Sequence, residues 1–445
     1  MNGELAISAG DTAWVLISAA LVFLMIPGLA LFYGGLVRTR GVLNTMMMSA
    51  AAIGIVGVQW ILVGYSLSFE PGGAFLGGLG WTALAGIGGS PNSDYAPTFP
   101  HIAFVLFQGM FAVITVALIS GAVVERMRFS VYLAFAVLWT TLVYDPLAHA
   151  VWGVGGWLRE LGALDFAGGT VVHISAGTSA MVAALLLGAR KDYGRIAFVP
   201  HNVPTTLLGA GLLWFGWFGF NAGSALAANG LAGLAFANTF GAGAAALAAW
   251  MLLELVRNSR STAVGAATGL VVGLVAITPA AGFVTPAAAL AIGAIAAVCS
   301  QFAIELRAHT RLDDSLDVFA CHGVAGIAGA VMTGIFATTD ANPAGANGLL
   351  YGDAGQLGVQ LFAIIVTIAF SAAGTAGILV LLEAVFGLRV SLADELHGID
   401  LSQHGEEAYY GADVGALVGR RAPIGESVLL PATEIQSAAR LQPQE

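Results

Sequence analysis

Two histidines lie deep inside apolar stretches of this sequence, and each follows an aspartate after a few residues. His173 comes after Asp165, and His322 comes after Asp317. Ionisable groups are costly within an apolar span, so each marks a candidate functional position. Imidazole titrates near neutral pH and exchanges protons through both nitrogens, so a facing pair would suit a proton relay. The alternative is that each histidine is a hydrogen-bonded core residue.

Aromatic side chains gather at three further places, accompanied by one hydroxyl group. The residues are Phe107 with Phe111, Trp152, and Phe220 with Ser224. The faces of aromatic rings attract small cations, and a serine hydroxyl can accept a hydrogen bond from one. These residues could therefore form a cage for a small cation. An aromatic belt facing lipid at the membrane interface is the alternative.

The composition places these residues in a membrane protein. Of 445 residues, 58% are apolar and only 9% are charged, and the mean hydropathy is +0.85. Soluble chains carry about 25% charged residues. With 16 basic against 26 acidic residues there is no basic face for nucleic acid. These values argue against a cytosolic enzyme, a nucleic-acid binder and a disordered chain. Cys299 and Cys321 lie in apolar stretches and are expected to be small core residues, and the sequence indicates no metal site and no cofactor.

Eleven runs are long and apolar enough to predict transmembrane helices of about 20 residues. No run alternates apolar and polar residues as a membrane β-barrel requires, so the fold class is an all-α polytopic membrane protein. The predicted spans are 12–34, 43–67, 102–124, 129–150, 170–189, 203–221, 232–255, 262–280, 285–306, 318–338 and 357–386.

The basic residues predict the orientation of these spans. Fifteen of the 16 follow odd-numbered spans, and Arg159 is the exception. This bias places the N-terminus outside and the C-terminus inside the cell. Spans one to five and six to ten then form two inverted five-helix repeats, followed by a final helix. Since His173 and His322 lie in the last span of each repeat, we expect them to meet near the membrane centre.

The chain divides into a membrane domain, residues 1–386, and a cytoplasmic tail, residues 387–445. Thirteen of the 59 tail residues are charged, and no run there could span a membrane. Residues 411–445 are expected to be flexible. No nucleotide-binding loop is present, which argues against transport driven by ATP in this chain.

Several motifs together resemble the ammonium transporter family, the Amt, Mep and Rh superfamily, and in particular its bacterial and plant-type Amt branch. The resemblance covers about residues 10–410 in the family's order. The motifs are Ile26-Pro27-Gly28 continuing to Arg38, Phe107-Gln108-Gly109, the run from Asp165 to His173, the run from Phe218 to Ser224, and Asp317-Val318-Phe319 followed by His322-Gly323.

This resemblance implies a site on the outer side and a gate beneath it. Phe111, Trp152 and Ser224 would form the site that recruits ammonium. The gate would comprise Phe107, Phe111 and Phe220, with Phe107 and Phe220 stacked below Phe111.

The resemblance also implies roles for the histidines and aspartates. His173 and His322 would be a twin-histidine pair lining an apolar pore. Asp165 would be a buried carboxylate that shapes the recruitment site without touching the substrate, and Asp317 would support the second histidine. No catalytic residue and no metal ligand is implied.

The implied assembly is a homotrimer in the cell inner (plasma) membrane, in which each protomer has its own pore and contacts lipid. The segment from Gly387 to Tyr410 resembles the family's regulatory tail, where a PII-type signalling protein docks on the cytoplasmic face.

Physical chemistry favours a specific mechanism for such a pore. An unpaired ion in an apolar medium costs tens of kcal/mol in the ideal limit, whereas a cation–π contact contributes about 0.5–2 kcal/mol. We therefore expect ammonium to be bound, deprotonated, and carried as ammonia with the proton relayed separately, giving electrogenic uptake. The alternatives are an electroneutral ammonia channel and an ammonium sensor signalling through the tail.

Overall fold

The chain folds as one long bundle of helices. The computed structural model describes residues 6–409, and within them the backbone forms no β-strand beyond two isolated bridges. The α-helices of this part are α1 (Ala9–Leu36), α2 (Val42–Gln59), α3 (Tyr65–Phe69), α4 (His101–Val123), α5 (Phe129–Trp139), α6 (Asp145–Trp152), α7 (Trp157–Glu160), α8 (Ser175–Leu187), α9 (Val203–Trp217), α10 (Gly230–Asn258), α11 (Ala263–Ile277), α12 (Pro286–Ala308), α13 (Ala325–Phe336), α14 (Ala354–Phe386), α15 (Leu392–His397) and α16 (Ile399–His404).

Several of these helices begin, end or are interrupted at a short π-helical segment. Such segments are rare in proteins and occur frequently at functional sites. They are η2 (Trp60–Gly64), η4 (Thr140–Tyr144), η5 (Gly169–Ile174), η6 (Phe218–Ala222) and η7 (Phe319–Val324). Short 3₁₀ turns cover Thr39–Gly41, Thr82–Leu84 and Leu349–Tyr351.

Ten helical stretches among the described residues are long and apolar enough to cross a membrane. They coincide with ten of the eleven predicted spans, which confirms an all-helical membrane protein. The stretches are Ala9–Leu36, Thr39–Phe69, His101–Val123, Phe129–Glu160, Gly169–Leu187, Val203–Ala222, Gly230–Asn258, Pro286–Ala308, Phe319–Phe336 and Ala354–Phe386.

The predicted eighth span, 262–280, differs from the others. Its helix α11 has 15 residues, which is about 22 Å and less than the roughly 30 Å of a bilayer core. The helix ends at Ile277, and the chain then turns through Thr278 and Pro279. A proline in the following residues cannot continue the helix, which accounts for the early end.

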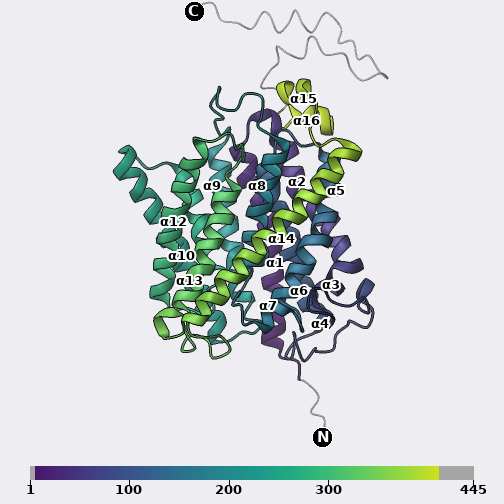
Figure 1. Ribbon diagram of the computed structural model, residues 1–445, viewed down its shortest axis with the longest axis vertical. Helices are drawn as coiled ribbons and strands as arrows, with labels where there is room; N and C mark the ends of the chain where they lie inside the picture. Colours follow the sequence, from purple (N-terminus) through teal and green to yellow (C-terminus); the bar gives the residue numbers. More distant parts are fainter. Residues whose placement is uncertain (1–5, 410–445) are drawn as a thin grey trace, which may run out of the picture.

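Figure 1 shows the bundle with α15 and α16 at one end, here called the tail face, and α3, α6 and α7 at the opposite face. Helix α1 packs along α9, and α4 is buried over most of its length at the centre. The long helix α14 crosses the outside of the bundle diagonally and contacts α5, α8 and α13. It therefore connects the two faces. The predicted flexibility of residues 411–445 lies outside the described residues.

Candidate functional site

The structure brings the two histidines of the apolar spans into direct contact. His173 lies in η5 and His322 in η7, both almost fully buried. Their rings stack with centroids 5.4 Å apart and planes 24° apart. The two Nδ1 atoms are 3.3 Å apart, so one imidazole can donate to the other. Such a contact shares a single proton between two rings.

A close approach of two helices makes this contact possible. Gly177, one turn after His173, faces Gly323, the neighbour of His322. A Cβ atom on Gly177 would lie only 2.4 Å from the Gly323 Cα. Small residues let helix backbones approach closely within a membrane. The glycines therefore set the distance between the two rings.

Asp165 fixes the start of the first histidine segment. Its carboxylate accepts hydrogen bonds from the backbone N–H groups of Gly168 (2.7 Å), Gly169 (2.6 Å) and Thr170 (2.8 Å). The first N–H groups of a helix lack partners within it, and a carboxylate placed there supplies them. The backbone carbonyl of Asp165 also accepts from Trp152 Nε1 at 2.9 Å. Asp165 thus holds both the histidine segment and the indole.

Asp314 plays the corresponding part at the start of the second histidine segment. Its carboxylate accepts from the backbone N–H of Phe319, at the start of η7, at 2.7 Å. Asp314 precedes His322 by eight residues, as Asp165 precedes His173. Sequence reasoning missed Asp314, although this repeated spacing could have identified it. Burial, assisted by the charge of Asp317, raises the pKa of Asp314 to about 6.

Asp317, expected to support the second histidine, lies in a different contact. Its carboxylate pairs with Arg307 at 2.5 Å, and its backbone adopts a positive φ of 56°. Only its carbonyl faces the histidine segment, where it accepts from Cys321 N–H at 2.9 Å. Its carboxylate therefore belongs to the loop before η7.

A column of aromatic rings leads from the opposite face to the histidines. Trp152 meets Phe111 edge to face, with centroids 6.2 Å apart. Phe111 stacks on Phe220 at 4.1 Å and 24°. Phe220 in turn lies 6.0 Å from the His173 ring. A continuous series of ring contacts thus connects the indole to the imidazole.

The stacked pair of this column is Phe111 with Phe220, whereas the expectation paired Phe107 with Phe220. Phe107 meets Phe111 edge on at 4.9 Å. Its ring also packs on Gly223, where a Cβ would lie 2.9 Å away. Phe107 therefore borders the segment of Ser224, which is itself partly exposed and donates to the Phe220 carbonyl at 2.9 Å.

A narrow cavity of about 10 Å³ lies beside the histidines, a volume that suits about one water-sized molecule. His173 and His322 are its polar lining residues, and the other ten are apolar. His173 Nε2 is buried without a hydrogen-bond partner. Trp217 stacks on the His173 ring at 5.4 Å and donates to Thr278 Oγ1. The cavity thus offers one unpaired imidazole nitrogen in apolar surroundings.

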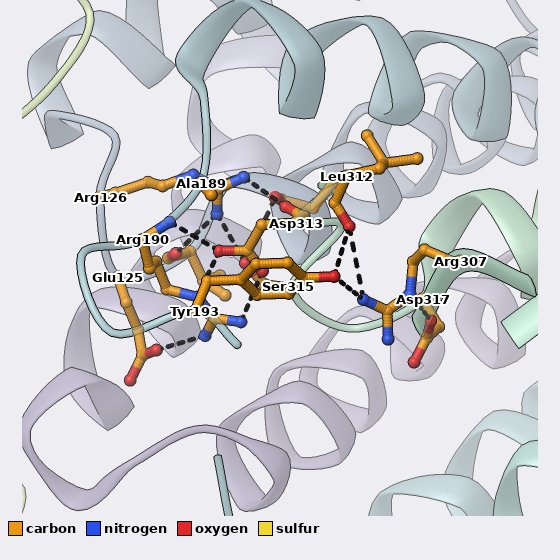
Figure 2. Close-up of polar contacts among 12 residues, drawn as sticks. Glu125, Arg126, Ala189, Arg190, Tyr193, Arg307, Leu312, Asp313, Ser315 and Asp317 are labelled. Atoms are coloured by element: carbon orange, nitrogen blue, oxygen red, sulfur yellow. Dashed lines mark hydrogen bonds and ion pairs between the residues drawn. The ribbon is translucent and has the colours of Figure 1, made fainter. Parts of the chain in front are cut away.

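A buried ionic layer closes the tail face. Arg190 contacts both Glu125, at 2.5 Å, and Asp313, at 2.8 Å, and Arg38 contacts Glu125 at 2.8 Å. Figure 2 shows Arg190 between the two carboxylates. Burial raises the pKa of Glu125 and of Asp313, but the arginines outweigh it and hold both pKa values below the ordinary range. Both carboxylates are therefore ionised at neutral pH.

Arg126, fully buried, joins three segments of this layer through uncharged oxygens. It donates to the Gly188 carbonyl (2.9 Å), the Asp313 carbonyl (2.5 Å) and Ser315 Oγ (2.6 Å). These contacts tie the ends of α4 and α8 to the loop that contains Asp314. The positions of these arginines in the sequence indicate the orientation of the spans but not these contacts.

The first part of the tail docks on the same layer. Arg389 donates to the Leu187 and Ala189 carbonyls and pairs with Glu395 at 2.6 Å. Glu395 also accepts from the Lys191 N–H at 2.6 Å. The tail is thus bonded to the end of α8, the helix that follows His173.

The chain is similar to known proteins over nearly its whole length. The sequence matches the model of the Ammonium Transporter Family over residues 13–409. It is 51% identical to the ammonium transporter of Bacillus subtilis over 401 residues, which cover 90% of this chain and 98% of that protein. It is also 51% identical to that of Aquifex aeolicus over 412 residues, covering 91% and 95%.

Two solved structures have a similar overall fold. The crystal structure of Mep2 from Candida albicans aligns with a TM-score of 0.84 at 37% identity, covering 92% of each chain. A structure of a sensor Amt protein aligns with a TM-score of 0.82 at 29% identity, covering 89% of this chain and 98% of that one. Since the family model and these relatives span nearly the whole chain, the protein belongs to the ammonium transporter family.

Proposed function

We propose that this protein takes up ammonium by separating it into ammonia and a proton at the twin histidines. One observation carries the proposal: the stacked pair of His173 and His322, with one unpaired ring nitrogen, lines an otherwise apolar cavity. Ammonia fits such a cavity and bonds to the nitrogen. An ammonium ion there would have no charged partner and would be strongly disfavoured.

The aromatic column supplies the steps before the cavity. Phe111, Trp152 and Ser224 gather ammonium, because ring faces attract cations and the hydroxyl oxygen accepts an N–H bond. Phe111 and Phe220, stacked at 4.1 Å, form the gate together with Phe107, which meets Phe111 edge on. Below this gate the ion gives its proton to the His173–His322 pair, ammonia passes into the cavity, and the histidines relay the proton. Potassium has no proton to lose, so it is excluded.

The proposal includes the arrangement of the chain in the membrane. Eleven spans, with α11 as the short eighth, form two inverted repeats and a final helix, and the tail face lies in the cytoplasm of a plasma-membrane homotrimer. The matched spacing of Asp165 to His173 and Asp314 to His322 supports the repeats. Residues 1–386 form the membrane domain, and residues 387–445 form a regulatory tail that a PII-type protein can engage.

An ammonium sensor is the second candidate function. It is favoured by the similarity to the sensor Amt structure and by the bonds between the tail and the end of α8. A sensor would bind ammonium at the aromatic column and change the tail without net transport.

Reconstitution in proteoliposomes tests these candidates. An ammonium pulse is expected to give a saturable current, and a potassium pulse is expected to give none. Trp152→Leu is expected to raise the half-saturating ammonium concentration about tenfold, because it removes the aromatic ring. Liposomes without protein are the control. Alkalinisation of the lumen without current would establish the neutral ammonia channel. Ammonium binding with neither signal would establish the sensor.

A further inference from the structure

We propose that Gln360, on the outer helix α14, is a positioning residue for Trp152 in the recruitment of ammonium; the inference rests on the proposed function. Gln360 is 1% exposed. Its Oε1 accepts from the Leu164 N–H at 2.7 Å, and its Nε2 donates to the Leu164 carbonyl at 2.8 Å. One side chain thus pairs with both backbone groups of a single loop residue.

Leu164 directly precedes the residue that holds the indole. The carbonyl of Asp165 accepts from Trp152 Nε1 at 2.9 Å, and its carboxylate binds the start of η5. The position of this backbone therefore decides where the indole lies relative to Phe111. Gln360 fixes that position from outside the loop.

The chemistry of the contact requires a primary amide. Glutamine presents one donor and one acceptor side by side, which matches the N–H and C=O of one residue. Glutamate would keep the acceptor and lose the donor, and leucine would lose both. A backbone group buried without a partner is costly, so the loop would shift to recover one.

A second amide on the same helix strengthens the contact. Gln356, one turn earlier, donates to the Gly162 carbonyl at 3.0 Å and to Gln360 Oε1 at 3.3 Å. The other face of this part of α14 is apolar and exposed, with Leu361 at 43% and Ile365 at 63%. A polar side chain is costly inside a membrane helix unless it finds a partner, and these two both bond to the 162–164 loop.

The decisive comparison is Gln360→Leu in proteoliposomes, with the ammonium current measured over a range of concentrations. The half-saturating concentration should rise about fivefold to tenfold, while the maximal current per reconstituted protein changes by less than about twofold. Gln360→Glu, which keeps one of the two bonds, should give an intermediate rise and provides a second variant should Gln360→Leu fail to fold. Thr367→Val is the matched control, because the Thr367 hydroxyl is buried on the same helix without a partner.

A double variant separates positioning from a general structural role. In the Trp152→Leu background, Gln360→Leu should raise the half-saturating concentration no further, since its effect passes through the indole. An unchanged half-saturating concentration in the single variant, or full additivity in the double variant, would overturn the inference. If the wild type carries no ammonium current, the proposed transport fails. Ammonium binding to the purified protein, followed by tryptophan fluorescence, then tests Gln360 by the same comparison of affinities.

Discussion

The two histidine segments share one plan but are held in different ways. In the first, the Asp165 carboxylate binds the four consecutive backbone N–H groups of residues 168–171 and the Thr170 hydroxyl. In the second, the Asp314 carboxylate binds the N–H of Phe319, and its Oδ1 is buried without a partner. The first cap is saturated, and the second is not.

This difference corresponds to what each segment adjoins. The first continues into the aromatic column, where the indole and the gate need a fixed geometry. The second follows a loop that Arg126 ties to the ionic layer, on which the tail docks. The first half of the path is therefore held by its own carboxylate, whereas the second half is linked through Arg126 and the ionic layer to the docked tail.

The largest effect is expected from Asp165→Asn. An amide keeps one acceptor oxygen, so several N–H groups at the start of η5 would lose their partner. We expect transport to fall by about two orders of magnitude or more, because each unsatisfied buried group costs about 1–3 kcal/mol. Asp314→Asn, which keeps an oxygen for Phe319, should retain most activity. Transport per folded protein measures both, and equal losses would contradict the difference between the caps.

The second effect concerns the ionic layer. Arg190→Gln leaves Glu125 and Asp313 buried without their shared partner, which should destabilise the protein by about 3–5 kcal/mol. Arg257→Gln is the matched control, because the Arg257–Glu305 pair is 39% exposed on both sides, and exposed pairs contribute about 0–1 kcal/mol. Thermal unfolding in detergent measures both variants. A similar loss of stability in both variants would show that the buried ionic layer stabilises the protein no more than an exposed ion pair does.

A smaller effect follows from the raised pKa of Asp314. Its pKa is about 6, mainly because of burial, against an ordinary 3.8. The folded protein therefore binds this proton more tightly than the unfolded chain, and its stability falls as pH rises from about 4 to 6. Asp314→Asn removes this dependence. Relative to wild type, the variant should gain about 2–3 kcal/mol between pH 4 and 7. Unfolding midpoints measured at several pH values test this, and a constant difference between the two proteins would refute it.

The smallest effect is expected at the docked tail. Glu395→Gln weakens the contacts with Arg389 and the Lys191 N–H, a loss of about 1–2 kcal/mol for charge-assisted hydrogen bonds. Because the tail adjoins the second half of the path, the maximal current should change while the half-saturating ammonium concentration does not. A cysteine placed at Ala408, labelled with a maleimide, reports whether the tail has detached. A change in the half-saturating concentration alone would place the tail's influence in the first half.

The sequence allowed much of this arrangement to be predicted, for identifiable reasons. Ionisable groups are so rare in the apolar spans that the two histidines could be singled out, and opposite repeats implied that they meet. Ten spans follow from length and hydropathy alone. The short length of α11 does not follow from them, because the helix ends at a local turn through Thr278 and Pro279.

Side-chain partners were harder to predict where several candidates lie close together. Asp313, Asp314 and Asp317 fall within five residues, and each binds a different partner: Arg190, the Phe319 N–H and Arg307. Spacing along the chain does not reveal these directions, because the loop's path decides them. The same holds for the gate, where Phe107 and Phe111 lie one helical turn apart and the packing of α4 selects Phe111 to stack on Phe220.

The central claim is that proton and ammonia part at the twin histidines. The most direct test compares the currents evoked by ammonium and by potassium in proteoliposomes containing the wild type or the double variant His173→Ala, His322→Ala. A current with ammonium only in the wild type, and its loss or the appearance of a potassium current in the double variant, is the predicted result. An ammonium-specific current that survives in the double variant unchanged would contradict the claim.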